Sequence, residues 1–208
     1  MLEAQDLRPL LKELLREMFT QERDMLAELI YEVMEDVAMA RAIAVAKFFP
    51  KADRHNPDVE PIAKNLNTFL EVLKKRIPKG LIDPQTARAM VLKSGGVMRE
   101  LVRIARECCT ECMVQIEIEP DRENIVINEG IFNEAVQNLR HDFTRQIGSS
   151  LYDLLVQIYE TSESEDSSNE GFVKLLHGLM VLEYENASLW YDVHPIVVDL
   201  LKQKKLIK

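Results

Sequence analysis

Apolar residues recur at helical spacing through the first 47 residues of the chain. They form two successive stripes that are out of phase by about one residue, with a polar run over residues 20–24 between them. The stripes comprise Leu7, Leu11, Leu14 and Met18, followed by Leu26, Ile30, Val33, Val37 and Ala40. A kink or short turn in the polar run would let both stripes face one core. Because a long helix needs a partner to cover such a stripe, we expect an N-terminal arm that binds a protein partner or a second copy of the chain.

The second stripe supplies the candidate interface residues of this arm, Leu26, Ile30, Val33 and Val37. The composition of the segment from Glu28 to Ile43 resembles that of the partner-binding helices of small bacterial antitoxins. This resemblance is one of composition, and it implies a protein partner for the helix.

Proline residues divide the next part of the chain into shorter helices. Phe48-Phe49-Pro50 ends the N-terminal helix, because proline lacks a backbone donor and restricts the residue before it. A loop over residues 51–61 leads into a predicted helix over 62–76. Asp83-Pro84 is typical of a cap followed by a first helical turn, and it predicts a further helix over 84–93.

The stretch from Lys93 to Cys109 organises the middle of the chain. Gly95 and Gly96 permit a tight turn in which positive φ costs little, and an amphipathic helix that reaches about Met113 follows. On one face this helix carries three arginines spaced four and three residues apart, Arg99, Arg103 and Arg106. Their guanidinium groups are candidates for pairing with carboxylates, and we expect Arg99 to be the costliest to replace because it lies nearest the turn.

The remaining pattern predicts short strands among helices. The predicted elements are strands over 114–118 and 125–127, a helix over 129–160 with a bend at Gly148, an acidic loop over 161–170, a helix over 172–179, strands over 180–184 and 190–193, and a helix over 196–205. The fold class is therefore mainly α with small β hairpins. We divide the chain into an N-terminal helical arm (1–49), a helical bundle (50–113) and a third region (114–208).

Two segments together resemble the C-terminal part of a family of prokaryotic ATPases. The Ser-Gly-Gly-Val-x-Arg-x-Leu run at residues 94–101 resembles the start of the lid helix of AAA+ and STAND-type ATPases, a motif called sensor 2. Leu-Glu-Tyr at 182–184 and Trp-Tyr-Asp-Val-His-Pro at 190–195 resemble the closing segment of such ATPases that carry a winged helix after the lid. The resemblance spans roughly residues 58–201.

This resemblance implies a lid-like bundle over 50–113 and a winged-helix-like domain over 114–208. It places Arg99 where the family's arginine reaches the nucleotide phosphates. The chain departs from the family because it contains no Gly-x-x-x-x-Gly-Lys-Ser/Thr phosphate loop. The implied protein is a lid and a winged helix without the motor domain.

Charge is distributed unevenly along the chain. The net charge is −9, yet residues 74–106 carry nine basic and two acidic residues, whereas residues 107–195 carry eighteen acidic and four basic ones. Such segregation indicates a polarised surface or contacts between the two regions, and the overall sign argues against non-specific binding to nucleic acid. No apolar run approaches membrane-spanning length, and three clustered cysteines do not make a disulfide framework. We expect a cytoplasmic protein.

Candidate catalytic chemistry finds little support in the sequence. Cys108 and Cys112 share a helical face, but structural zinc takes four ligands and no histidine lies nearby, so we interpret the cysteines as buried apolar groups. His194 precedes a proline and is expected to have a structural role. The sequence predicts no enzyme, no metal site and no cofactor.

Two hypotheses from different classes remain. The first is a non-catalytic interaction or regulatory protein, derived from the ATPase lid and winged helix, that oligomerises or binds a partner through its N-terminal helices. The second is a nucleic-acid-binding regulator that uses the winged helix, which needs a basic recognition surface. Residues 172–179, the helix before the second hairpin, contain a single lysine, Lys174, so the first hypothesis is favoured. A truncated fragment of a longer ATPase is the third possibility.

Overall fold

A computed structural model describes residues 45–118, 126–164, 169–185 and 189–208. The chain divides into two compact units, residues 1–43 and 44–208. Within its described residues the second unit contains seven α-helices and one two-stranded antiparallel sheet, so the prediction of a mainly α fold is confirmed. The predicted N-terminal stripes, with Leu26, Ile30, Val33 and Val37, lie outside the described residues.

In the first half of this unit the helices begin and end close to the predicted residues. A 3₁₀ turn, η1 (Lys51–Asp53), precedes α2 (Ala63–Arg76), which buries Leu66, Phe69 and Leu73 on one face. Helix α3 (Pro84–Lys93) begins where the sequence predicts, because the Asp83 carboxylate accepts hydrogen bonds from the Thr86 backbone N–H at 2.9 Å and from its hydroxyl at 2.8 Å.

Helix α4 (Met98–Ile118) is longer than predicted. The strand expected over residues 114–118 is wrong: this segment continues the helix, and its apolar side chains are exposed. As a whole, α4 packs on α5 (Glu129–Gln146). The expected return strand pairs elsewhere, since the Ile127 backbone donates to Leu81 O at 2.8 Å and accepts from Asp83 N–H at 3.1 Å. The alternating apolar residues Val114, Ile116 and Ile118 therefore lie on an exposed helix end, and their alternation does not mark one face of a sheet.

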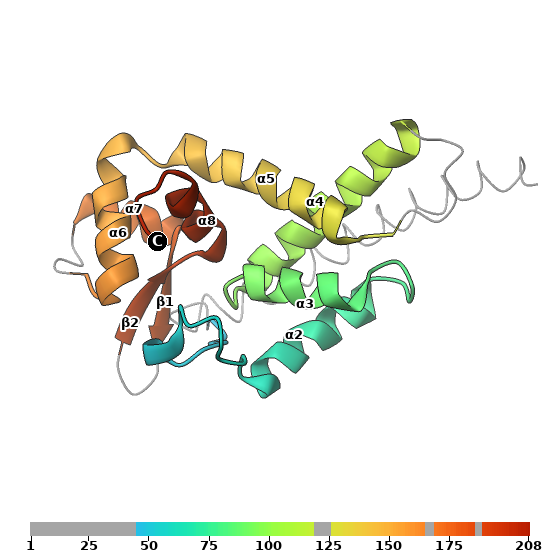
Figure 1. Ribbon diagram of the computed structural model, residues 1–208, viewed down its shortest axis with the longest axis horizontal. Helices are drawn as coiled ribbons and strands as arrows, with labels where there is room; N and C mark the ends of the chain where they lie inside the picture. The colour runs from blue at the N-terminus through green and yellow to red at the C-terminus, as the bar shows by residue number, and fades with distance from the viewer. Residues whose placement is uncertain (1–44, 119–125, 165–168, 186–188) are drawn as a thin grey trace, which may run out of the picture. The chain divides into compact units, whose positions relative to one another are not determined.

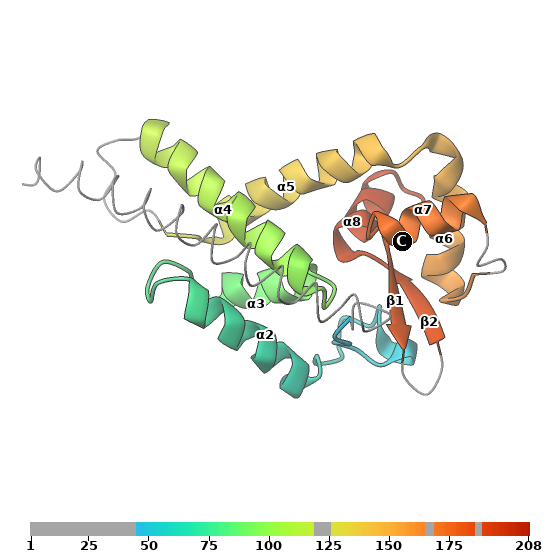
Figure 2. The same cartoon turned by 180° about the vertical axis from the view of Figure 1, so that it is seen from behind.

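The C-terminal part places a hairpin among short helices. After α5 the chain bends at Gly148, as predicted, and continues through η2 (Ser149–Leu151), α6 (Tyr152–Thr161) and α7 (Glu170–His177). Strands β1 (Val181–Glu185) and β2 (Leu189–Val193) pair antiparallel with Val181 opposite Val193, and α8 (Pro195–Gln203) follows. Figure 1 and the reverse view in Figure 2 show α5 crossing α4 and leading into the group formed by α6, α7, α8 and the hairpin.

One continuous apolar core extends through residues 48–207 and takes side chains from α2 to α8. A smaller cluster contains Val97, Leu179, Leu182, Tyr184 and Trp190. The predicted boundary at residue 113 falls inside α4, and the assignment of 114–208 as a winged-helix-like domain stays a prediction. In the part of the chain that the structure describes, no helix combines the length and apolarity needed to cross a membrane.

Candidate functional site

The Gly95–Gly96 turn is the point where three distant segments meet. Both glycines have positive φ, 63° and 82°. The Ala46 N–H donates to Gly96 O at 2.9 Å, and the Tyr184 hydroxyl donates to Gly95 O at 2.9 Å. A Cβ on Gly96 would overlap the Ala46 carbonyl oxygen and lie 2.7 Å from its carbon, and one on Gly95 would overlap Leu182. The turn therefore requires glycine both for its φ angles and for close approach of the backbone.

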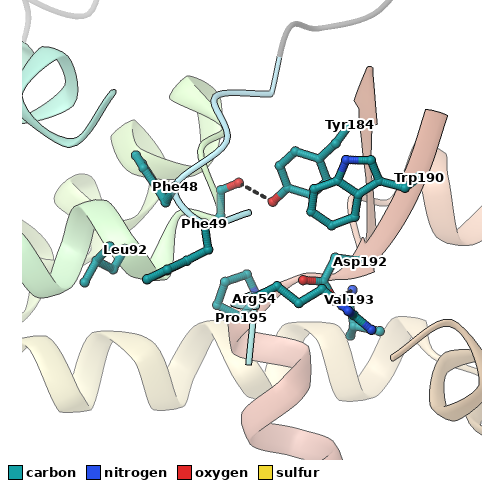
Figure 3. A pocket seen from close by; sticks show the side chains of 10 residues that line it. Phe48, Phe49, Arg54, Leu92, Tyr184, Trp190, Asp192, Val193 and Pro195 are labelled. Atoms are coloured by element: carbon teal, nitrogen blue, oxygen red, sulfur yellow. Dashed lines mark hydrogen bonds and ion pairs between the residues drawn. The ribbon is translucent and has the colours of Figure 1, made fainter. Parts of the chain in front are cut away.

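Aromatic side chains gather beside this turn, as Figure 3 shows. The Tyr184 and Trp190 rings stack with centroids 4.4 Å apart, and burial raises the pKa of the Tyr184 phenol. Together with Phe48 and Phe49 they line a cavity of about 60 Å³. A cavity of this size holds a few water molecules at most, so it does not bind a cofactor-sized ligand.

Arg54 lies at the edge of the same cavity and joins the segment before α2 to α6. Its guanidinium donates to Tyr159 O at 3.0 Å and to Lys51 O at 2.7 Å. Asp192 on β2 lies 3.9 Å from Arg54 Nε and 3.4 Å from His55 Nε2. An arginine on the last carbonyls of a helix satisfies acceptors that have no partner within the helix. Nothing in the local sequence around Arg54 points to α6, so the sequence alone does not identify this residue.

A buried ionic group connects α4, α5 and α8. The Glu100 side chain is almost fully buried, and Arg103 lies 3.3 Å from it and 3.3 Å from Asp142 on α5. The Arg103 guanidinium also lies over the Phe143 ring, 5.2 Å from its centroid. His194, at the start of α8, places Nε2 3.9 Å from the Glu100 carboxylate. Arg103 is therefore held by carboxylates on two helices and by an aromatic ring.

His194 is fully buried and uncharged. Its Nδ1 accepts a hydrogen bond from the Ile196 N–H at 3.2 Å and so caps α8, which leaves the ring hydrogen on Nε2. Burial lowers the pKa of His194 to about 3, and the nearby charges of Arg103 and Lys93 act in the same direction. This agrees with the structural role expected from the sequence.

The depressed pKa of His194 predicts a specific loss of stability in acid. Its pKa lies below the ordinary value of 6.5, so the unfolded chain binds the proton first and stability falls as pH drops below 6.5. The wild-type free energy of unfolding is expected to fall by about 1.4 kcal/mol per pH unit more steeply than that of His194→Asn between about pH 6 and 4.5. The asparagine oxygen can still cap α8, so urea denaturation of both proteins across this range is the measurement. Parallel slopes would show that His194 titrates normally.

The three candidate arginines differ in their ion pairing and exposure. Arg103 is paired, whereas Arg99 and Arg106 are exposed and make no ion pair with any residue in the described parts of the chain. Cys108 and Cys112 are buried as expected, and burial raises the pKa of Cys112 to about 11. Among the described residues no group of three or more His, Cys, Asp or Glu side chains is placed to hold a metal ion.

Comparison with protein-family models matches residues 1–41 to a RelB-like antitoxin family, described as a putative antitoxin family. The match covers about a fifth of the chain. No curated protein and no solved structure matches.

The predicted resemblance to the lid and winged helix of an AAA+ or STAND-type ATPase is therefore wrong. The family that matches is an antitoxin family, and its match lies in residues 1–41, outside the range of roughly 58–201 that carried the ATPase resemblance. A sensor 2 role for Arg99 is withdrawn with it, as is the interpretation of the chain as an ATPase fragment. The matched residues include most of the segment 28–43, whose composition resembles antitoxin helices.

Proposed function

We propose that this chain is a non-catalytic, antitoxin-like interaction protein that binds a protein partner through residues 1–41. The observation that carries the proposal is the match of these residues to an antitoxin family. The apolar stripe of Leu26, Ile30, Val33 and Val37 supports it, because a helix with one apolar face binds by burying that face on a partner. Because the matched family is described as an antitoxin family, the proposed partner is a toxin protein. We place both proteins in the cytoplasm.

The body formed by residues 44–208 supports a binding role over an enzymatic one. Its buried ionic groups, Glu100, Arg103 and His194, bind one another and cap or join helices. Catalytic groups would instead be expected around a cleft with room for a substrate. The Arg54–Asp192 pair lines both the cavity of about 60 Å³ and an open hollow of about 390 Å³, and there the Arg54 guanidinium donates to the main-chain carbonyls of Lys51 and Tyr159.

A nucleic-acid-binding regulator is the second candidate function. A surface hollow between α5 and α7 is lined by Arg145, Lys174 and His177, which would suit phosphate groups. Glu170 lines the same hollow, and the neighbouring hairpin carries Glu183 and Glu185. Because like charges repel the phosphate backbone, this function is the less favoured.

Disrupting the N-terminal stripe tests the proposed function. We expect Ile30→Asp/Val33→Asp in the full chain to weaken partner binding at least about a hundredfold, because two charges would be buried in the interface. A control, Glu28→Asp/Glu35→Asp, places two aspartates on the opposite side of the predicted helix and should bind normally. The partner is captured with the wild-type chain, identified by mass spectrometry, and its affinity is measured with purified components by isothermal titration.

Growth provides the functional measurement. Expression of the captured partner alone should arrest the growth of bacteria. Co-expression of the wild-type chain, or of the control Glu28→Asp/Glu35→Asp, should restore growth. The stripe variant should fail to restore growth. A captured partner that binds the stripe variant as tightly as the wild-type chain, or that is harmless when expressed alone, would refute the antitoxin-like proposal.

A further inference from the structure

The open hollow of about 390 Å³, which we call the α3–α8 hollow, is lined by the segment before α2 and by residues of α3, α5, β2 and α8. It shares a wall with the smaller cavity, and Figure 3 shows Phe49, Leu92 and Asp192 of this wall. Most of its lining side chains are apolar, among them the ring of Phe132. Its volume lies within the range of roughly 300–1,000 Å³ that is typical of sites for small organic molecules.

The charges on the lining of the α3–α8 hollow balance. Besides His55, the hollow is lined by two basic side chains, Arg54 and Lys93, and by two acidic ones, Asp192 and Asp199. A ligand with a large net charge, such as a nucleoside phosphate or a polyamine, would meet as much repulsion as attraction there. The lining therefore favours a ligand without net charge.

Helices α3 and α8 each bring two apolar side chains and one charged side chain to the hollow. On each helix the second and third positions follow the first by three and four residues, so all three share one face. These side chains are Ala89, Leu92 and Lys93 on α3, and Pro195, Val198 and Asp199 on α8. The apolar surface of the hollow therefore adjoins the two charged groups.

The ion pair between these two groups stays partly open to solvent. The Lys93 ammonium donates to Asp199 Oδ2 at 2.6 Å, and the two side chains are 25% and 31% exposed. The ammonium has two further N–H groups and the carboxylate a second oxygen, and neither group forms another hydrogen bond or ion pair with a residue that the structure describes. An uncharged apolar ligand would remove water from the pair and replace it with nothing, which costs free energy. A ligand that carries both an ammonium and a carboxylate replaces that water.

The two charges of such a ligand must lie side by side. Lys93 Nζ and Asp199 Oδ2 are 2.6 Å apart, so their complement is an ammonium and a carboxylate as close together as they are on one α-carbon. In a longer peptide the terminal charges are separated by the chain. We propose that the α3–α8 hollow binds a free α-amino acid with a large apolar side chain. Its carboxylate accepts from Lys93, its ammonium donates to Asp199, and its side chain packs on Phe132 and Val198. This site is additional to the partner site proposed for residues 1–41 and independent of it.

A ligand series on the full chain tests the proposal. The probe is L-phenylalanine, titrated into the isotope-labelled protein and followed by heteronuclear NMR. The backbone amide signals of Lys93, Phe132 and Asp199 should shift, with a dissociation constant of about 1 mM or lower. Phenylpropionate lacks the ammonium and phenylethylamine lacks the carboxylate, so each should bind at least about tenfold more weakly. Glycine lacks the apolar side chain and should bind at least about thirtyfold more weakly.

Two variants test which side chain recognises which charge. Lys93→Met should abolish the preference for phenylalanine over phenylethylamine and keep the preference over phenylpropionate, because only the carboxylate of the ligand has lost its partner. Asp199→Asn should do the reverse. The matched control is Lys174→Met, which removes an exposed lysine from the hollow between α5 and α7 and should leave every affinity unchanged.

The wild-type ligand series decides the proposal even if one of the variants does not fold. Equal affinities for phenylalanine, phenylpropionate and phenylethylamine would overturn the proposal, as would the absence of shifts at Lys93, Phe132 and Asp199 in about 10 mM phenylalanine. Ile30→Asp/Val33→Asp, which disrupts the site proposed for the protein partner, should bind phenylalanine like the wild-type chain. Failure of one proposal is therefore distinguishable from failure of the other.

Discussion

Gly96→Ala is expected to lower the free energy of unfolding by about 3 kcal/mol or more. Alanine is strained at the φ of 82° that this residue adopts, and its Cβ would overlap the Ala46 carbonyl. Relief of the overlap requires the segment around Ala46 to move, which breaks its hydrogen bond to Gly96 O. Urea denaturation followed by circular dichroism measures the loss.

Gly80→Ala is the matched control for this substitution. Gly80 also has positive φ, 92°, but a Cβ there would meet no atom within 4 Å. Its replacement should therefore cost only the backbone strain, about 1 kcal/mol. If the two variants lose equal stability, the close approach of Ala46 to the turn contributes nothing and the proposed junction of segments is wrong.

Arg103→Ala is expected to lower the free energy of unfolding by about 3 kcal/mol, because it strands the buried Glu100 carboxylate. The Arg103 side chain is 25% exposed, so water compensates part of the loss and the effect falls at the lower end of the range for buried pairs. Asp142 on α5 loses the same partner. Denaturant unfolding at pH 7 gives the value.

Arg99→Ala and Arg106→Ala serve as controls on the same helix. Both arginines are exposed without an ion pair among the described residues, and each replacement should cost less than about 0.5 kcal/mol. Adding Glu100→Gln to Arg103→Ala should recover stability, because the stranded charge is then removed. Equal losses at all three arginines, or no recovery in the double variant, would contradict the role of the buried ionic group. The expectation from the sequence that Arg99 is the costliest position rested on its closeness to the glycine turn, and the contacts assign that place to Arg103.

Most helices could be predicted from local chemistry alone. The proline after Asp83 sets the start of α3 at Pro84, and the apolar spacing of Leu66, Phe69 and Leu73 predicts the buried face of α2. The hairpin was predicted within one residue at each end for the same reason: alternation and turn residues are properties of a few neighbouring positions.

Contacts between distant residues decided the rest. Residues 114–118 alternate like a strand, but they continue α4 with their apolar side chains exposed, and Ile127 pairs with the segment at residues 81–83 instead of with them. No local signal joins Glu100 to His194, which are far apart in sequence, or Arg54 to the end of α6. The candidate site was therefore predictable only in part: its glycine turn was visible, and its buried partners were not.

There is a physical reason why the local sequence predicts some of these features and only the tertiary structure decides the others. Periodicity, capping and glycine placement indicate which backbone conformation each segment prefers and which of its faces is apolar. These local preferences determined the mainly α fold and the turn at Gly95–Gly96. They do not state which other segment covers that face, because packing energy depends on side chains brought together from across the chain. Only the tertiary structure could place Ala46 and Tyr184 on the turn, bury Glu100 against Arg103 and His194, and leave Arg99 and Arg106 exposed.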